Sequence, residues 1–186
     1  LHSTSRRQRQ MCIRDRIRRG EARTACTYNN IPLDRVHFLD LPFYETGKIQ
    51  KNPISEADVE IVRNLLREVK PHQIFVAGDL ADPHGTHRVC TDAVFAAIDL
   101  EKEEGAKWLK DCRIWMYRGA WAEWEIENIE MAVPISPEEL RAKRNSILKH
   151  QSQMESAPFL GNDERLFWQR SEAVSYTHLT LPTTSR

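Results

Sequence analysis

The amino-acid sequence predicts an α/β fold with a mostly parallel sheet and helices on both of its faces. Stretches in which apolar residues recur at helical spacing alternate along the chain with short, continuous apolar runs. The runs are apolar at successive positions, which is typical of strands that are covered on both sides. At 186 residues, the chain corresponds to one domain of ordinary size.

The first two predicted elements are a helix and a strand. Residues 17–30 place alanines and a cysteine on one helical side and end in two asparagines before Pro32, which is a helix stop signal. Residues 36–42, V-H-F-L-D-L-P, form a short apolar run closed by a proline, and they predict a buried strand. Asp40 lies at the end of this predicted strand.

A second helix and strand follow. Ser55 and Asp58 have the spacing of a capping box, and apolar residues at helical spacing continue from there until Pro71. Residues 73–78, Q-I-F-V-A-G, predict a strand buried on both faces. A polar loop then leads to a third predicted helix that starts near His87.

Residues 113–153 show the same alternation of predicted strands and helices. Residues 113–118, R-I-W-M-Y-R, predict a strand, and residues 129–135 form another apolar stretch. Ser136, Pro137 and Glu139 together give a strong helix start, with an N-cap, a proline at the first helical position and a capping-box glutamate. This helix is expected to reach about Gln153.

The two ends of the chain differ in composition from the body. Residues 1–16 are rich in arginine and show almost no apolar periodicity, while residues 174–186 switch to serine and threonine without any acidic residue. Both segments resemble translated adaptor sequence found at the ends of reading frames from metagenomic assemblies. We therefore expect both to be non-native or disordered, with a basic arm and a β-strand tail as alternatives, and assign the domain to residues 17–173.

The N-terminal segment also differs in charge from the rest of the chain. Residues 1–19 contain seven arginines and one acidic residue, whereas residues 20–173 contain 19 basic and 26 acidic residues. An acidic body lacks the basic face that nucleic-acid binding requires, so we expect no nucleic-acid partner. The chain also has no apolar run long enough to cross a membrane.

The cysteines predict a reducing compartment. The four cysteines show no C-x-x-C spacing, and Cys26, Cys90 and Cys112 lie in apolar stretches where a cysteine usually packs as a small hydrophobic residue. The N-terminus has no apolar signal-peptide segment. We therefore expect reduced thiols in a cytoplasmic protein.

The candidate chemistry lies in the loop after the strand predicted at residues 73–78. In open α/β sheets, ligands bind beyond the carboxyl ends of the strands, and the loop there reads D-L-A-D-P-H-G-T-H. His84 and His87 can point the same way at a helix entry, and a nearby carboxylate can orient a ring. These groups suit a metal ligand and a proton-transfer partner. The alternative is that they only face solvent or satisfy backbone groups.

The loop D-P-H-G-T-H-R resembles the second histidine motif of the LmbE/PIG-L family of zinc-dependent N-acetyl-sugar deacetylases. Further similar features are E-A-R-T-A-C, H-F-L-D-L-P and the late helix K-R-N-S-I-L-K-H-Q-S-Q. The sequence of the loop is most similar to that of the LmbE-like domain fused behind a glucosamine-6-phosphate deaminase domain in some bacteria. The segments Y-R-G-A-W-A-E-W and G-N-D-E-R-L-F-W-Q-R share this similarity. The resemblance implies a three-layer, Rossmann-like sheet.

The resemblance also implies residue roles. His87 would be a zinc ligand, and His84 would stabilise the oxyanion formed from the acetamide carbonyl. Asp82 would orient a histidine, or would simply cap the turn before Pro83. The expected cofactor is zinc, and the expected ligand is an N-acetylated amino sugar or a sugar phosphate.

The chain departs from the family pattern at one motif. The other zinc ligands and the general base come from an A-H-P-D-D segment after the first strand, and this segment is absent from the sequence. A catalytic zinc site ordinarily has three protein ligands. We therefore expect an N-terminally truncated fragment that lacks its first strand and is inactive as written. The alternative is a non-catalytic module of a deaminase fusion, which could carry the name of the deaminase.

Other polar and aromatic residues have weaker claims. The aromatic residues Trp115, Tyr117, Trp121 and Trp124 could stack on a sugar, but such a stripe is more often core. His150 is expected to serve packing or a helix end. No functional role is predicted for His37 or His72, and Glu123 and Glu125 are expected to face water.

Overall fold

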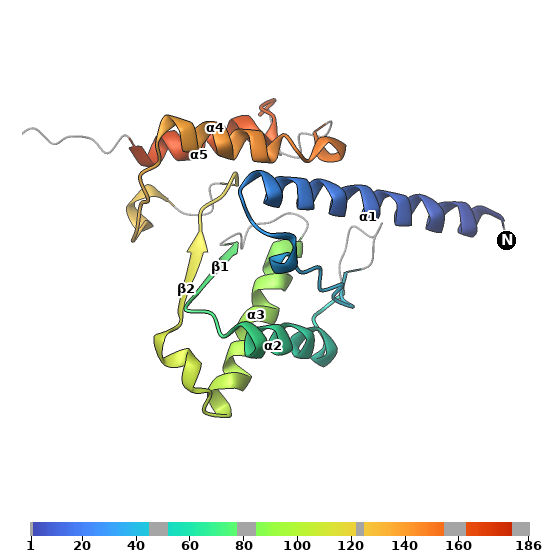
Figure 1. Cartoon of the computed structure of the whole chain (residues 1–186), viewed down its shortest axis with the longest axis vertical. Coiled ribbons are helices and arrows are strands. Elements are labelled where there is room, and N and C mark those ends of the chain that lie inside the picture. Colours follow the sequence, from blue (N-terminus) through green and yellow to red (C-terminus); the bar gives the residue numbers. More distant parts are fainter. Residues whose placement is uncertain (1, 45–51, 78–84, 122–124, 155–162, 180–186) are drawn as a thin grey trace, which may run out of the picture. The chain divides into compact units, whose positions relative to one another are not determined.

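The computed structural model describes residues 2–44, 52–77, 85–121, 125–154 and 163–179. The chain divides into two compact units. Unit 1 comprises residues 1–37 and 124–186, and unit 2 comprises residues 38–123. Figure 1 labels the helices and strands of both units.

Unit 2 contains the sheet. Strand β1 (Gln73–Ala77) pairs in parallel with strand β2 (Arg113–Tyr117), with Gln73 opposite Arg113 and Ala77 opposite Tyr117. Both strands form where the sequence predicts them. Helix α3 (Thr86–Glu103) and the 3-10 helix η2 (Lys107–Asp111) connect them, which gives the strand–helix–strand order of an α/β fold.

Helix α2 (Glu56–Val69) begins at the predicted capping box. The Ser55 side chain accepts from the Asp58 backbone N–H, and the Asp58 carboxylate accepts from the Ser55 backbone N–H at 2.8 Å. Asp58 is fully buried and also accepts from the backbone N–H of Phe43 at 2.9 Å. One carboxylate therefore fixes both the start of α2 and the approach of the preceding segment.

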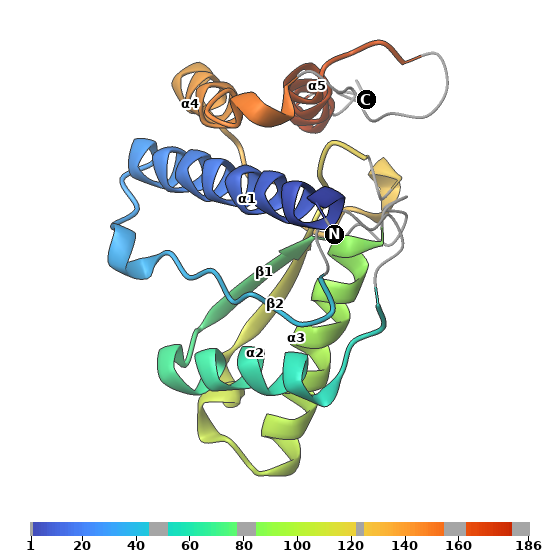
Figure 2. The ribbon, with the colours of Figure 1, turned by 90° about the vertical axis from the view of Figure 1, so that its right-hand side faces the viewer.

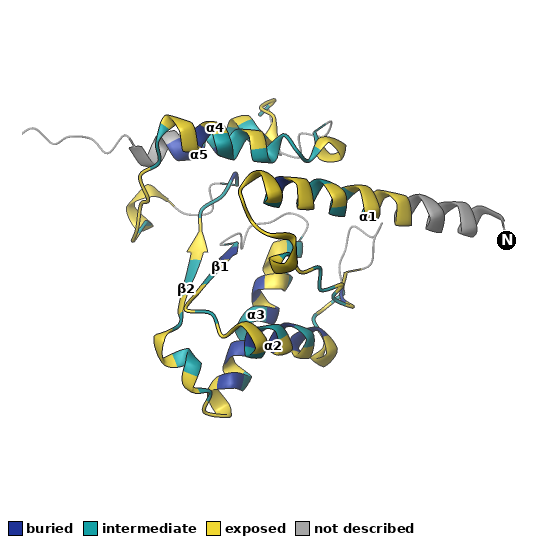
Figure 3. Ribbon diagram, in the orientation of Figure 1, coloured by how far each residue is buried: buried dark blue, intermediate teal, exposed yellow. Residues whose placement is uncertain are grey.

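The core of unit 2 lies between α2, α3 and the sheet. Buried residues of α2 (Val59, Val62, Leu66) meet Ala93, Ala97 and Ile98 of α3. Ile74 of β1 and Ile114 of β2 pack against this cluster. Figures 1 and 2 show both helices on the same side of the strands, and Figure 3 shows their buried positions in dark blue. On the other face, Phe75 of β1 is 59% exposed.

The prediction of a strand at residues 36–42 is wrong. The segment is irregular and pairs with no other described strand, and the 3-10 helix η1 (Leu33–Arg35) precedes it. Asp40 has φ 51°, a left-handed conformation that interrupts the regular pleat of a strand. The apolar residues still have a structural use, because Leu39 and Leu41 pack against the unit 2 core.

Unit 1 is helical in the part that the structure describes. Helix α1 (His2–Tyr28) packs on α4 (Pro137–Ile147), which in turn packs on α5 (Phe167–Leu179). The described part of the unit also contains three 3-10 helices, which are η1, η3 (Ile126–Asn128) and η4 (Gln151–Gln153). The capping box predicted at the start of α4 forms, but α4 ends at Ile147 rather than near Gln153.

Hydrogen bonds between side chains hold α1 to the α4–η4 segment. The Asn29 amide donates to Ser146 Oγ at 2.7 Å, and the Asn145 amide donates to the Tyr28 hydroxyl at 3.1 Å. The Glu21 carboxylate accepts from both the backbone N–H and the hydroxyl of Ser152.

Parts of both end segments, which were expected to be non-native or disordered, are helical. Helix α1 begins at His2 instead of residue 17, so residues 2–16 are helical, as arginine and glutamine permit. Helix α5 continues past the predicted boundary at residue 173, and Val174 and Ser175 are buried. Lys143 of α4 donates to Ser175 Oγ at 2.8 Å, which ties this part of the tail to unit 1.

Candidate functional site

The candidate site lies at the carboxyl end of β1, where the chain enters α3. The predicted loop joins Ala77, the last residue of β1, to Gly85, the N-cap of α3. The buried Thr91 of α3 donates its hydroxyl to the carbonyl oxygen of Ala77 at 3.1 Å. This hydrogen bond fixes the first turns of α3 against the strand end. The position agrees with the ligand-binding edge of open α/β sheets.

Gly85 is required by the backbone at this junction. Its φ of 67° is in the left-handed region, which L side chains rarely adopt. A Cβ added to Gly85 would meet no described atom within 4 Å, so the constraint is the backbone angle and not crowding. Because Gly85 has no side chain to cap the helix, the first backbone N–H groups of α3 receive no N-cap side chain.

Of the three predicted site residues, the structure describes one. His87 is the second residue of α3 and is exposed, as a residue that reaches a ligand requires. His84 and Asp82, together with Asp79, lie outside the described residues. The roles predicted for them remain predictions.

The described residues do not fit a catalytic zinc site. Over the described ranges, no three histidine, cysteine, aspartate or glutamate residues come together as a metal cluster. A catalytic zinc ion ordinarily needs three protein ligands and an open position for water. His87 is the one predicted site residue within the described ranges, and it could supply one ligand.

A substitution at Thr91 tests how much its hydrogen bond to Ala77 contributes to the stability of the candidate site. Replacing Thr91 by valine keeps the shape but leaves a carbonyl near the core without its donor. We expect a loss of about 1 kcal/mol in the free energy of unfolding, measured by chemical denaturation. Thr91→Ser retains the hydroxyl and is the matched control. No loss in Thr91→Val together with a loss in Thr91→Ser would show that the methyl group, and not the hydrogen bond, matters.

The other predicted candidates are distributed over both units. Trp115 is half-buried and donates its indole N–H to Gln73 Oε1 at 3.2 Å, whereas Tyr117 is 52% exposed. Trp121 is half-buried, and Trp124 and Glu123 lie outside the described residues. His150 follows the C-cap of α4, as its predicted helix-end role requires, and Glu125 is exposed as predicted.

The expected burial of the cysteines is only partly correct. Cys26 and Cys112 are half-buried, and burial raises the pKa of the Cys112 thiol. Cys90 is exposed, although its spacing of three and seven residues places it on the same side of α3 as the buried residues Ala93 and Ala97. No disulfide joins cysteines in the part of the chain that the structure describes.

A search against protein-family models matches residues 2–98 to PIG-L, described as GlcNAc-PI de-N-acetylase. The match covers more than half of the chain, including β1, the loop and the start of α3. The chain belongs to the PIG-L family. The predicted resemblance is thereby confirmed, and the strand–loop–helix segment with His87 lies within the PIG-L match.

A curated relative of this PIG-L chain comes from Bacteroides thetaiotaomicron. It is named "Putative glucosamine-6-phosphate deaminase-like protein" and is 94% identical over 162 residues. The match covers 87% of this chain but 24% of the relative, so the chain spans about a quarter of that protein. No solved structure matches. Among the described helices, none is both long enough and apolar enough to span a membrane.

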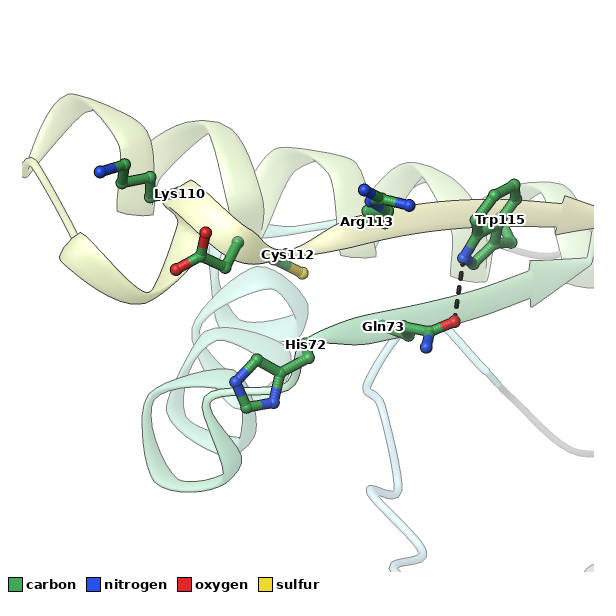
Figure 4. A pocket seen from close by; sticks show the side chains of 7 residues that line it. His72, Gln73, Lys110, Cys112, Arg113 and Trp115 are labelled. Carbon is green, nitrogen blue, oxygen red and sulfur yellow. Dashed lines mark hydrogen bonds between the residues drawn. The ribbon is translucent and has the colours of Figure 1, made fainter.

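Sequence reasoning missed a second group of polar residues, at the opposite end of the sheet. A hollow of about 370 Å³ lies at the amino ends of β1 and β2. It is lined by His72, Gln73, Lys110, Asp111, Cys112, Arg113 and Trp115 (Figure 4). The available signal was the charged run K-D-C-R, which ends at the first residue of the second strand, together with His72 immediately before the first strand.

Proposed function

We propose that this chain is part of a PIG-L family hydrolase that removes the N-acetyl group from an amino sugar. The observation that carries this proposal is the family match across β1, the histidine loop and the start of α3. The site position supports it, because His87 is exposed in the first turn of a helix that Thr91 fixes to the strand end. The substrate class is an N-acetylated amino sugar or its phosphate.

In this proposal, the chain supplies part of the catalytic machinery. His87 is the proposed zinc ligand, His84 the proposed group beside the oxyanion, and Asp82 a positioning residue. Because the sequence has no A-H-P-D-D motif, we propose that the chain alone holds zinc weakly and is inactive. The compartment we propose is the cytoplasm.

A second candidate function is a non-catalytic PIG-L module within a deaminase-like protein. The name of the 94% identical relative and the absence of an A-H-P-D-D motif from the sequence favour it. In this reading, His87 has no catalytic role, and the module binds a sugar phosphate or supports a fused deaminase domain upstream.

Zinc titration of the chain tests the role of His87. We expect isothermal titration calorimetry to show weak zinc binding that His87→Ala weakens at least tenfold, because one of the few ligands is lost. His37→Ala is the matched control, since His37 is an exposed histidine of unit 1. Equal effects of the two substitutions would contradict the assignment of His87.

An activity assay separates the two candidate functions. A longer form that carries an A-H-P-D-D motif ahead of this segment is assayed for acetate release from N-acetylglucosamine and its 6-phosphate. Under the hydrolase proposal, His87→Ala lowers acetate release at least tenfold, while His37→Ala leaves it unchanged. Acetate release that is insensitive to His87→Ala would favour the non-catalytic module.

A further inference from the structure

The hollow at the amino ends of the strands combines cationic side chains with one carboxylate. His72 precedes β1, and Lys110, Asp111 and Arg113 come from the end of η2 and the start of β2. In the part of the chain that the structure describes, Asp111 forms no ion pair with Lys110 or Arg113. The two permanent cations and the carboxylate are therefore available to a ligand.

An aromatic ring forms one wall of the same hollow. Trp115 projects from β2, and its indole N–H is held by Gln73 of the neighbouring strand at 3.2 Å (Figure 4). This hydrogen bond restricts the orientation of the indole ring. A fixed aromatic face beside polar groups is a surface on which a sugar ring can stack.

The chemistry of these groups defines a ligand class. A guanidinium and an ammonium together favour a phosphate, which accepts several charge-assisted hydrogen bonds. A carboxylate beside them repels a simple anion but attracts an ammonium group. The volume of about 370 Å³ is at the lower end of the range for small-molecule sites. We propose that this hollow binds a small molecule with both a phosphate and an amine, of the amino-sugar phosphate class.

The proposed site is separate from the candidate catalytic site. Gln73 and Arg113 begin their strands, whereas Ala77 and the loop that leads to His87 lie at the other end. The four residue steps from Gln73 to Ala77 span about 13 Å. The proposal therefore assigns a second ligand site, and it depends neither on zinc nor on deacetylation.

Binding to the full chain tests the proposal without any activity measurement. Glucosamine 6-phosphate, glucose 6-phosphate and inorganic phosphate are titrated, and affinity is measured by calorimetry. We expect glucosamine 6-phosphate to bind most tightly, and Arg113→Gln to weaken it at least tenfold. Lys107→Gln is the matched control, because Lys107 lies in η2 and is exposed but does not line the hollow.

Asp111→Asn isolates the amine. This substitution is expected to abolish the preference for glucosamine 6-phosphate over glucose 6-phosphate while leaving glucose 6-phosphate binding intact or stronger. The NMR signal of the Trp115 indole N–H, assigned by its loss in Trp115→Phe, is expected to shift on titration. Binding that Arg113→Gln and Lys107→Gln affect equally, or the absence of binding by all three ligands, would overturn the proposal. Equal affinity for both sugar phosphates in the parent chain would overturn the role of Asp111.

Discussion

Replacing Glu101 by alanine is expected to lower the free energy of unfolding by about 3 kcal/mol. Glu101 of α3 is 3% exposed, and its Oε1 accepts from Arg63 Nε at 2.7 Å and from Arg67 Nε at 2.6 Å. Arg63 of α2 is itself 7% exposed. Removing the carboxylate leaves a buried guanidinium without its main partner, which costs more than the net contribution of the intact pair.

The expected loss is at the lower end of the range for buried ion pairs, because Arg63 keeps other partners. It also contacts Glu60 at 3.0 Å and forms an ion pair with Glu104, and both of these carboxylates reach solvent. Glu103→Ala, on the same helix at an exposed position, is the matched control and is expected to change stability by less than about 0.5 kcal/mol. Chemical denaturation of the full chain measures both variants.

A double substitution separates pairing from burial. Arg63→Met combined with Glu101→Met removes both charges and fills the space with apolar side chains, so its stability is expected to lie within about 1 kcal/mol of the parent chain. If the double variant were as unstable as Glu101→Ala, the loss would come from packing. In that case the ion pair would not explain how α2 and α3 are held together.

The sequence predicted the elements of unit 2 that carry local signals. The capping box at Ser55 and Asp58, and the continuous apolar run at residues 73–78, specify their structure through neighbouring residues. The segment at residues 36–42 carries the same apolar signal but forms no strand. A run of apolar residues therefore does not show whether the backbone finds a strand partner.

Features that depend on distant contacts could not be predicted in this way. Arg63 and Glu101 are 38 residues apart. Helical spacing places each on the buried side of its own helix, but it does not show that the two residues meet. Residues 2–16 lack apolar periodicity, so the prediction rested on their composition, although arginine and glutamine are good helix formers. At the candidate site, the loop position and His87 followed from the strand–loop–helix pattern. The hollow near Trp115 could not be predicted from the sequence, because its lining residues come together only through the register of β1 and β2.

Asp58→Ala is expected to lower the free energy of unfolding by about 2 kcal/mol. The Asp58 carboxylate accepts from the backbone N–H groups of Phe43 and Ser55 and from the Ser55 hydroxyl at 2.5 Å. Alanine leaves these donors without an acceptor in a buried position. Asp58→Asn retains one acceptor oxygen and is expected to lose less, while Asp34→Ala, at an exposed aspartate of η1, serves as the control.

The pH dependence of stability identifies the charge as the cause. Burial alone would raise the pKa of Asp58, but the hydrogen bonds from Ser55 and Phe43 outweigh it and hold the pKa below its ordinary value of 3.8. A folded-state pKa below the unfolded value means that the stabilisation is complete above about pH 4 and is lost as the pH falls through the folded pKa. Between pH 6 and pH 3, Asp58→Asn is therefore expected to lose less stability than the parent chain. Parallel losses for the two would mean that Asp58 stabilises α2 by shape and not by its charge.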